Sequence, residues 1–400
     1  MVLTAFYPVF FKSYWSSGTD TATSTLQLGI ANSVSSIVIV LLAPFLGAIA
    51  DVSQAKKRFL ITFGLVGISM TGCLYFVGEG NWLLASILFI FSAIGFSGAN
   101  IFYDSLIVNI ANDTQLDVVS ALGYSFGYLG GGLLFTICVA MSYWPESFGF
   151  LNAGEAVRFS FVAVSLWWFV FSLPIIFFVN EKQDKRSEKK ISVSLGFLQI
   201  KNTFREIRSL RMVFLFLIAY WFYIDGVDTI VRMAIDYGLS IGLASSDLIL
   251  AILVTQFVGF PSALLFGYFG QWWGAKRIVL ITIAIYLVLT VLASMMDSVY
   301  EFYVLAICIG LVQGGIQSLS RSFYARIIPQ NKSAEFFGFY NMLGKFAAVL
   351  GPLLMGVVGV ITGNPRISIL SISILFLIGG VLLFFVDESK AVKMAKDLEN

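Results

Sequence analysis

The chain has 400 residues, of which 58% are hydrophobic and 12% are charged, and its formal net charge is +2. A soluble globular protein carries about 25% charged residues, so this composition excludes that class and indicates helices that face lipid or each other. Histidine, the commonest metal ligand and the usual proton carrier near neutral pH, is absent, and we expect no metal, no cofactor and no enzyme activity.

Apolar runs separated by polar residues predict the membrane-spanning elements, because a spanning helix needs about 20 apolar residues. The first run is short, since Met1 to Trp15 would form about 22 Å of helix against about 30 Å of hydrocarbon. We predict an all-α membrane protein with twelve transmembrane helices, the first of them short or truncated. The runs lie at 1–17, 25–50, 59–78, 82–110, 118–143, 156–180, 211–238, 246–270, 277–296, 301–328, 335–362 and 366–386.

Ionisable residues are few in the first six runs. Asp51 closes the second run, and Asp104 lies six residues before the end of the fourth. The fifth run presents Tyr124 and Tyr128 on one helical face with Ser120. Such an uncharged polar stripe is either a hydrogen-bonded seam between helices or a surface that contacts a solute.

The long hydrophilic stretch 181–210 divides the chain almost in half. We interpret it as a solvated basic linker with an amphipathic piece that lies on anionic lipid headgroups. The predicted domains are therefore a six-helix half at 1–180, the linker at 181–210, a second six-helix half at 211–386 and a cytoplasmic tail at 387–400.

The seventh run, 211–238, contains the densest set of ionisable residues. Charged side chains inside a membrane are costly, which makes each one a candidate for function. Asp225 is about 21 Å from the start of the run, near the membrane midplane, and Asp228 stands four residues before Arg232, a spacing that predicts an ion pair. A polar stripe at helical spacing comprises Trp221, Asp225, Asp228, Arg232 and Asp236.

Two later runs add further candidates. Gln313 and Gln317 share a face of the run 301–328. Asn341 and Lys345 stand at i, i+4 in the run 335–362, and Lys345 is roughly 15 Å from the end of its helix. Lys345 is either a side chain that reaches back to the headgroups or one that faces a polar cavity, and we favour the cavity.

The positions of the basic residues predict the orientation. Alternate connections carry 20 of the 25 Lys and Arg residues, whereas the opposite connections carry Lys12, Arg158 and Arg366. Because basic loops stay in the cytoplasm, we predict a multi-pass protein of the cell membrane with both termini in the cytoplasm. The basic residues form this belt, so nucleic-acid binding is not expected.

The two halves also share sequence patterns. GAIADVSQAKKR, from Gly47, is echoed by GYFGQWWGAKR, from Gly267, and YDSLIVNI at 103–110 is echoed by SRSFYARI at 320–327. Internal repeats at half-chain spacing are typical of transporters whose substrate site lies between the halves near the midplane.

The glycine-to-basic loops resemble the signature loops of the major facilitator superfamily. The resemblance implies that Asp51 lies near a helix N-terminus of the opposite half and helps to hold the cytoplasmic face closed. The second copy has Gln271 at the acidic position.

Four longer stretches resemble the vacuole effluxer family, which comprises fungal autophagy-related amino-acid effluxers and bacterial relatives. They are VSALGYSFGYLGGGLL (119–134), YIDGVDTIVRMAIDYG (223–238), QGGIQSLSRSFYARIIP (313–329) and EFFGFYNMLGKFAAVLGPLL (335–354). The resemblance implies efflux of amino acids or similar small metabolites.

The repeat also predicts an inner gate. An offset of 217 residues relates Asp104 to Arg321, and in the superfamily the two helices that carry them are expected to line the central pathway. Opposite charges at these positions would meet only when the cytoplasmic side is closed. The alternative is that Arg321 reaches lipid headgroups and Asp104 caps a neighbouring helix.

We therefore predict a secondary active transporter of amino acids or similar small polar metabolites that works as a monomer. Arg232 and Lys345 would hold a solute carboxylate, and Asp225 or Asp228 would bind a coupling proton. One alternative is transport of a larger anionic solute, such as a siderophore or a peptide. Another is a membrane receptor or scaffold that moves no solute.

Overall fold

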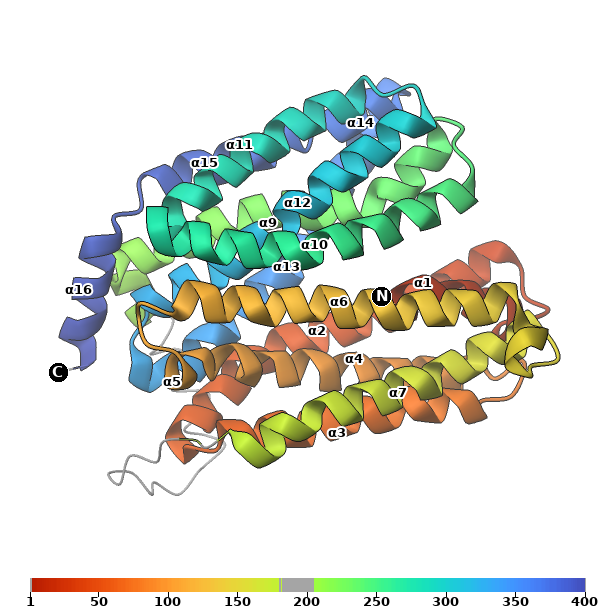
Figure 1. The fold of residues 1–400 in the computed structure, drawn as a ribbon, viewed down its shortest axis with the longest axis horizontal. Coiled ribbons are helices and arrows are strands. Elements are labelled where there is room, and N and C mark those ends of the chain that lie inside the picture. Colours follow the sequence, from red (N-terminus) through yellow and green to blue (C-terminus); the bar gives the residue numbers. More distant parts are fainter. Residues whose placement is uncertain (1, 180, 182–204, 400) are drawn as a thin grey trace.

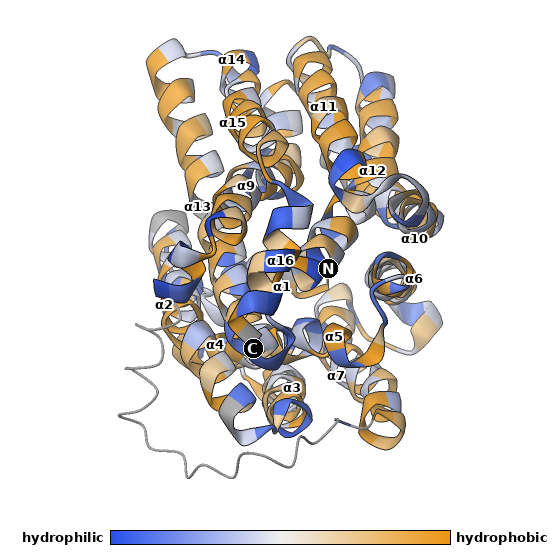
Figure 2. Ribbon diagram, turned by 90° about the vertical axis from the view of Figure 1, so that its left-hand side faces the viewer, coloured by the Kyte–Doolittle hydropathy of each residue, from blue (hydrophilic) through white to orange (hydrophobic). Residues whose placement is uncertain are grey.

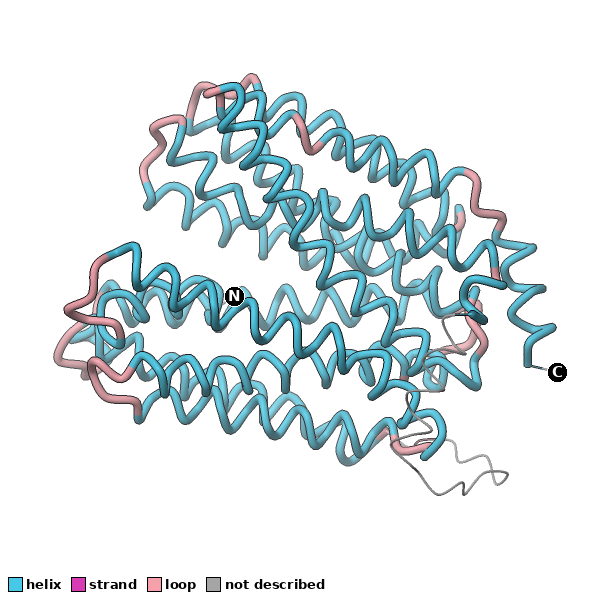
Figure 3. Tube along the Cα trace, turned by 180° about the vertical axis from the view of Figure 1, so that it is seen from behind, coloured by secondary structure: helices cyan, strands magenta, loops and turns pink. Residues whose placement is uncertain are grey.

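The computed structural model describes residues 2–179, 181 and 205–399, and within these residues the chain forms helices and the turns between them (Figure 3). The first half contains α1 (Val2–Phe10), a π-helical turn (Phe11–Trp15), α2 (Thr21–Ser53), α3 (Lys56–Cys73), α4 (Trp82–Ser105), α5 (Ile107–Ile110), α6 (Leu116–Tyr143) and α7 (Ala153–Phe178). The second half contains α9 (Arg211–Ser240), α10 (Ser245–Trp273), α11 (Ala275–Ser294), α12 (Val299–Ile327), α13 (Ser333–Thr362), α14 (Pro365–Leu370), α15 (Ser373–Phe384) and α16 (Glu388–Glu399).

The predicted fold class is confirmed. Among the described residues, 11 spans are long and apolar enough to cross a membrane, and the short element at 2–15 precedes them. That element is packed into the first half, because Trp15 is fully buried and donates from Nε1 to the carbonyl oxygen of Val77 at 3.2 Å. Tyr7 is buried beside it and donates to the carbonyl oxygen of Ala85.

Short polar sequences begin several helices at one end of the bundle. The side chain of Asp20 accepts from the backbone of Thr23 before α2, and Asn152 does the same for Glu155 at the start of α7. Ser298 and Glu301 form a capping box at the start of α12. These contacts satisfy amides that a helix N-terminus otherwise leaves unpaired.

The two halves lie closest at one end of the molecule and diverge toward the other (Figure 1). We call the closed end the basic end, since it carries Lys56, Lys57, Lys276 and Arg277 at the starts of α3 and α11, with α5 and α16 beside them. Across the interface α2 packs against α13, and α6 packs against α10. This paired arrangement places four helices along the central contact between the halves.

Hydrophobic residues make up most of the length of the long helices (Figure 2). On α7, Phe171 and Phe178 are 62% and 81% exposed. Hydrophobic side chains this exposed would be unfavourable in water but are stable in lipid. The exposed apolar surface therefore identifies the membrane-facing side of α7.

The predicted linker at 181–210 lies largely outside the described residues. At 387–400, where the sequence predicts a tail, the structure has α16. Ala391 is fully buried and Ala395 nearly so, because α16 packs on α9 and α12. The end of the chain is thus held against the second half at the basic end (Figure 1).

Candidate functional site

An ion pair joins the two halves near the basic end. Arg321 on α12 places Nη1 at 3.0 Å from Oδ1 of Asp104 on α4. Its Nε donates to the hydroxyl of Ser120 on α6 at 2.9 Å, and its Nη2 donates to the Ser120 carbonyl oxygen at 2.8 Å. Both charged side chains are largely buried. The guanidinium of the second half is therefore bonded to two helices of the first half.

Asn341 belongs to this same contact. Its Nδ2 donates to Oδ2 of Asp104 at 3.1 Å and to the carbonyl oxygen of Phe337 on its own helix. The sequence groups Asn341 with Lys345 as a solute ligand, and the structure instead brings it to the ion pair. The i, i+4 spacing places two residues on one helix face, but it does not say which neighbouring helix each side chain reaches.

Tyrosine rings surround the guanidinium of Arg321. Its central carbon lies 4.6 Å from the ring centre of Tyr124 and 5.4 Å from that of Tyr103. A cation over an aromatic face is stabilised by about 0.5–2 kcal/mol, with the larger value where water is excluded. The rings thus support a buried arginine that already has an anionic partner.

Asp51 also bridges the halves. Its carboxylate forms a 2.8 Å ion pair with Lys56, and Oδ2 accepts from the backbone amide of Glu335, in the first turn of α13, at 2.7 Å. A helix N-terminus carries a partial positive charge that favours such an anion. At the equivalent position of the second half, Gln271 donates to the carbonyl oxygen of Thr114, which precedes α6.

The structure contains a second ion pair between the halves that the sequence analysis did not predict. Asp117 on α6 accepts from Nη2 of Arg326 at 2.9 Å and from the hydroxyl of Ser322 at 2.5 Å. Arg326 also reaches Glu388 of α16 at 3.2 Å. The internal repeat could have indicated Asp117 as a candidate. Asp117 lies in the first turn of α6, and Glu335 lies at the corresponding place in the first turn of α13.

The residues of the polar stripe of α9 differ in their burial and in their hydrogen-bond partners. Asp225 is fully buried and accepts from the amide of Gly351 on α13 at 2.9 Å and from the hydroxyl of Thr229 at 3.2 Å. Asp228 is partly buried, whereas Arg232 and Asp236 are exposed. The stripe is therefore not one continuous surface.

The predicted ion pair between Asp228 and Arg232 is wrong. Among the described residues, no salt-bridge contact within 4.0 Å joins them. Charge from both Arg232 and Lys345 acts on the Asp228 carboxylate. An exposed i, i+4 pair gains only about 0.3–0.5 kcal/mol. This is too little for the spacing alone to hold Arg232 against Asp228. Asp228 and Lys345 come from α9 and α13, so the structure brings two of the predicted solute ligands near each other.

Tyrosines of both halves lie within the electrostatic field of Asp228. Its charge acts on Tyr124 and Tyr128 of α6 and on Tyr220 of α9. Tyr128 donates to Oε1 of Gln317 on α12 at 3.1 Å, and it packs against Gly259 of α10 and Gly314 of α12. We call this set the central polar cluster, and its members are Tyr124, Tyr128, Tyr220, Asp228, Arg232, Gln317 and Lys345.

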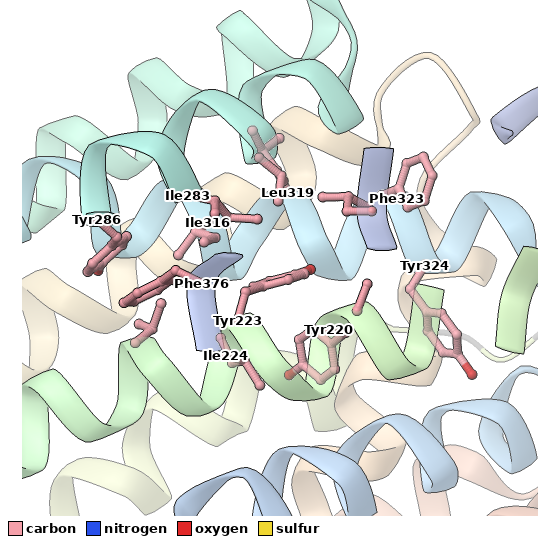
Figure 4. Packing of buried hydrophobic residues seen from close by; sticks show 14 of the residues in the cluster. Tyr220, Tyr223, Ile224, Ile283, Tyr286, Ile316, Leu319, Phe323, Tyr324 and Phe376 are labelled. Atoms are coloured by element: carbon pink, nitrogen blue, oxygen red, sulfur yellow. The ribbon is translucent and has the colours of Figure 1, made fainter. Parts of the chain in front are cut away.

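Buried aromatic side chains of α9 and α12 pack together within the second half, Tyr220, Tyr223 and Tyr324 among them (Figure 4). The ring of Tyr340 lies 4.1 Å from that of Tyr220 and 4.9 Å from that of Tyr324, both stacked. Tyr223 hydrogen-bonds Ser320 of α12 at 2.7 Å. These buried rings close the second half on the basic side of the cluster.

Two further residues predicted from the sequence, Gln313 and Trp221, each have an unpaired polar atom. Within the described part of the chain, Oε1 of Gln313 and Nε1 of Trp221 are buried without a hydrogen-bond partner. Buried polar atoms nearly always find a partner, so an unpaired one indicates a ligand or water.

A cavity of about 90 Å³ lies elsewhere, between α3, α4 and α7 of the first half. Its walls are mainly apolar, and they include none of the predicted site residues. An apolar cavity within one half does not suit a polar solute that must pass between the halves. The central polar cluster is therefore the better candidate site.

Comparisons with known proteins agree on one class. The sequence matches the family described as "Vacuole effluxer Atg22 like" over residues 16–396. It is 37% identical to the uncharacterized MFS-type transporter YxiO of Bacillus subtilis over 398 residues, which cover 99% of this chain and 93% of the relative. It is 24% identical to autophagy-related protein 22 of Saccharomyces cerevisiae, over 86% of this chain and 74% of that one.

Solved structures show the same fold. The proton:xylose symporter XylE superposes with a TM-score of 0.74 at 11% identity, covering 100% of this chain and 95% of XylE. The major facilitator transporter FucP, in its outward conformation, superposes with a TM-score of 0.68 at 11% identity, covering 96% and 98%. At such low identity these structures establish the fold alone.

Proposed function

Since the chain belongs to the vacuole effluxer family of major facilitator transporters, we propose that it is a secondary active transporter that exports amino acids or similar small polar metabolites. It would work by alternating access, with a coupling proton. The observation that carries the proposal is the central polar cluster, where the charge of Asp228 acts on tyrosines of the other half and Asp228 lies in the field of two cations.

The charges of the cluster suit a zwitterion. Lys345 and Arg232 would hold the carboxylate of the solute, and Asp228 would receive its ammonium group. Charge-assisted hydrogen bonds in a site that excludes water are roughly twice as strong as neutral ones. A solute with both charges would also neutralise side chains that are costly to leave exposed in a membrane.

The direction and the membrane follow from two different observations. Export is favoured by the description of the matching family as vacuole effluxers, and the position of the basic residues favours a cytoplasmic basic end. We propose a cell-membrane protein whose two termini lie in the cytoplasm. Asp104, Arg321 and Asp51 would then belong to an inner gate that is closed in this conformation.

A solute screen in proteoliposomes tests the function. The purified protein is reconstituted into liposomes that are loaded with an unlabelled solute. Exchange with the labelled solute outside is followed at two pH values, and protein-free liposomes serve as the control. We expect exchange of amino-acid-sized zwitterions. Exchange of only a siderophore or a peptide would replace the proposed substrate class, and binding without any exchange would favour a receptor.

A further inference from the structure

Asp225 is a carboxylate at the middle of α9 that has no cationic partner. Its side chain is fully buried, and among the described residues no Lys or Arg forms an ion pair with it. Oδ1 accepts both of its hydrogen bonds, from the amide of Gly351 and the hydroxyl of Thr229. Oδ2 is buried and has no partner.

The surroundings of Asp225 disfavour a negative charge. Asp228, on the same helix, acts on it with a like charge, and the hydrogen bond from the amide of Gly351 on α13 offsets only part of this cost. The neighbouring helix α15 contains no ionisable residue. A full charge at this position loses its hydration and has no cation to offset that cost, and a proton on the unpartnered Oδ2 would remove the charge.

Gly351 makes this contact possible. A Cβ atom added there would clash with Oγ1 of Thr229 and would lie 2.8 Å from Oδ1 of Asp225, so no larger residue permits the same approach of α13 to α9. Pro352 follows directly inside α13. A proline lacks an amide hydrogen and interrupts the helical ladder, which makes this part of α13 a natural point of bending.

We propose that Asp225 is the coupling-proton site and that its proton holds α13 against α9 in the conformation closed at the basic end. This inference rests on the proposed transport function and assigns its ion site. When the Oδ2–H bond breaks, the proton passes to water in the pathway. The remaining carboxylate needs hydration, and α13 must bend away at Gly351 and Pro352 to admit it.

An infrared titration without solute tests the site directly. The protein in lipid nanodiscs is titrated with alkali, and the carbonyl stretch of a protonated buried carboxyl group is followed in wild type, Asp225→Asn and Asp228→Asn. We expect the titrating band to vanish in Asp225→Asn and to remain in Asp228→Asn. Persistence of the band in a folded Asp225→Asn protein overturns the assignment.

A second variant covers the case in which Asp225→Asn does not fold. Gly351→Ala keeps the carboxylate but wedges α13 away from it, so water should reach Asp225 and the band should disappear at lower pH than in wild type. An unchanged titration in Gly351→Ala contradicts the proposal. Gly356→Ala, on the same helix with no atom within 4 Å of the added Cβ, is the matched control and should titrate as wild type.

The same titration separates this inference from the transport function. No solute is present, so a band that depends on Asp225 in a protein that exchanges no solute would leave the proton site standing and refute the transported class. Solute exchange combined with a band that does not depend on Asp225 would refute only the proton site.

Discussion

At the scale of single residues, Arg321 shows how a buried charge in this protein is stabilised. Its guanidinium is bonded to Asp104 and Ser120 of the other half and lies beside two tyrosine rings. The 217-residue repeat identifies Arg321 and Asp104 as equivalent positions, and the structure places them 3.0 Å apart. Their role as a gate stays a prediction.

Loss of Asp104 should open the basic end. The reporter cysteine is introduced by Ala334→Cys in a chain without Cys73, Cys138 and Cys308, because Ala334 is fully buried against residues of the first half. Asp104→Ala leaves Arg321 without its anion, and we expect a shift of about 1–3 kcal/mol, or roughly 5- to 150-fold in the open-to-closed ratio. The rate at which the reporter cysteine is alkylated measures this shift.

Asp104→Asn is the matched control for that experiment. Asparagine retains one oxygen acceptor for Arg321 and loses the charge, so its effect should lie between wild type and Asp104→Ala. An alkylation rate that stays at the wild-type value in both variants would remove Asp104 from the gate.

Substitutions of Lys345 should show whether solute binding depends on its charge or on its size. If Lys345 holds a solute carboxylate, Lys345→Gln loses a charged hydrogen bond of about 1.5–3 kcal/mol and should weaken solute binding by about tenfold or more. Lys345→Arg keeps the charge and should weaken it less. Calorimetric titration with the solute found in the screen gives both affinities, and equal values would assign Lys345 a structural role.

The contacts of Asp228 and Asn341 that the sequence did not predict have a common cause. Spacing along a helix identifies residues on one face but cannot supply the competing partner from another helix. Asp228 lies in the fields of Arg232 and Lys345 together, and Asn341 bonds Asp104 rather than acting beside Lys345. Both outcomes depend on the position of α13, which no local pattern encodes.

At the scale of elements, α2 and α13 approach each other closely across the interface between the halves. A Cβ added at Gly338 of α13 would lie 2.6 Å from the carbonyl oxygen of Ala43 on α2. Two backbones this close are possible only with a glycine at the contact. The contact exists in the closed basic end, so a substitution there should act selectively on that conformation.

Gly338→Ala should therefore favour opening of the basic end. Overpacking of this kind costs about 1–3 kcal/mol, which should raise the alkylation rate of the reporter cysteine about tenfold. Gly356→Ala on the same helix meets no atom within 4 Å and should leave the rate unchanged. Equal rates in the two variants would show that the α2–α13 contact does not control the gate.

The contact of α16 with Arg326 should matter less than that of α6. Glu388 is about one-third exposed, whereas Asp117 is nearly fully buried. Glu388→Gln should destabilise the closed basic end by less than about 1 kcal/mol. Asp117→Asn leaves Arg326 with a weaker partner and should destabilise it by about 3–5 kcal/mol. Alkylation of the reporter cysteine ranks them, and a larger effect of Glu388→Gln would identify α16 as the main latch.

The existence of the elements was readable from the apolar runs, but their ends were not. The run at 156–180 corresponds to α7, which begins at Ala153 because Asn152 caps it. α16 is amphipathic rather than apolar, so a search for membrane spans passes over it. Its docking depends on alanines buried against α9 and α12, a contact that exists only after folding.

At the scale of the whole molecule, the halves are joined at the basic end by two ion pairs and by one hydrogen bond from a backbone amide to a carboxylate. These centre on Asp51, Asp104 and Asp117 of the first half, and among the described residues every polar partner that they find across the interface comes from α12 or α13. Such a set can break as a unit when the halves rotate, as alternating access requires. The division of the chain at 181–210 stays a prediction.

The measurement that tests alternating access most directly is the distance between the halves at both ends of the protein in lipid. Spin labels are placed at the exposed positions Arg58 and Arg277 of the basic end, and in a second sample at Glu79 and Tyr300 of the opposite end. We predict that solute, or the change Asp104→Ala, lengthens the first distance and shortens the second. Two distances that stay fixed, or that change in the same direction, would contradict a transporter that opens its two ends in turn.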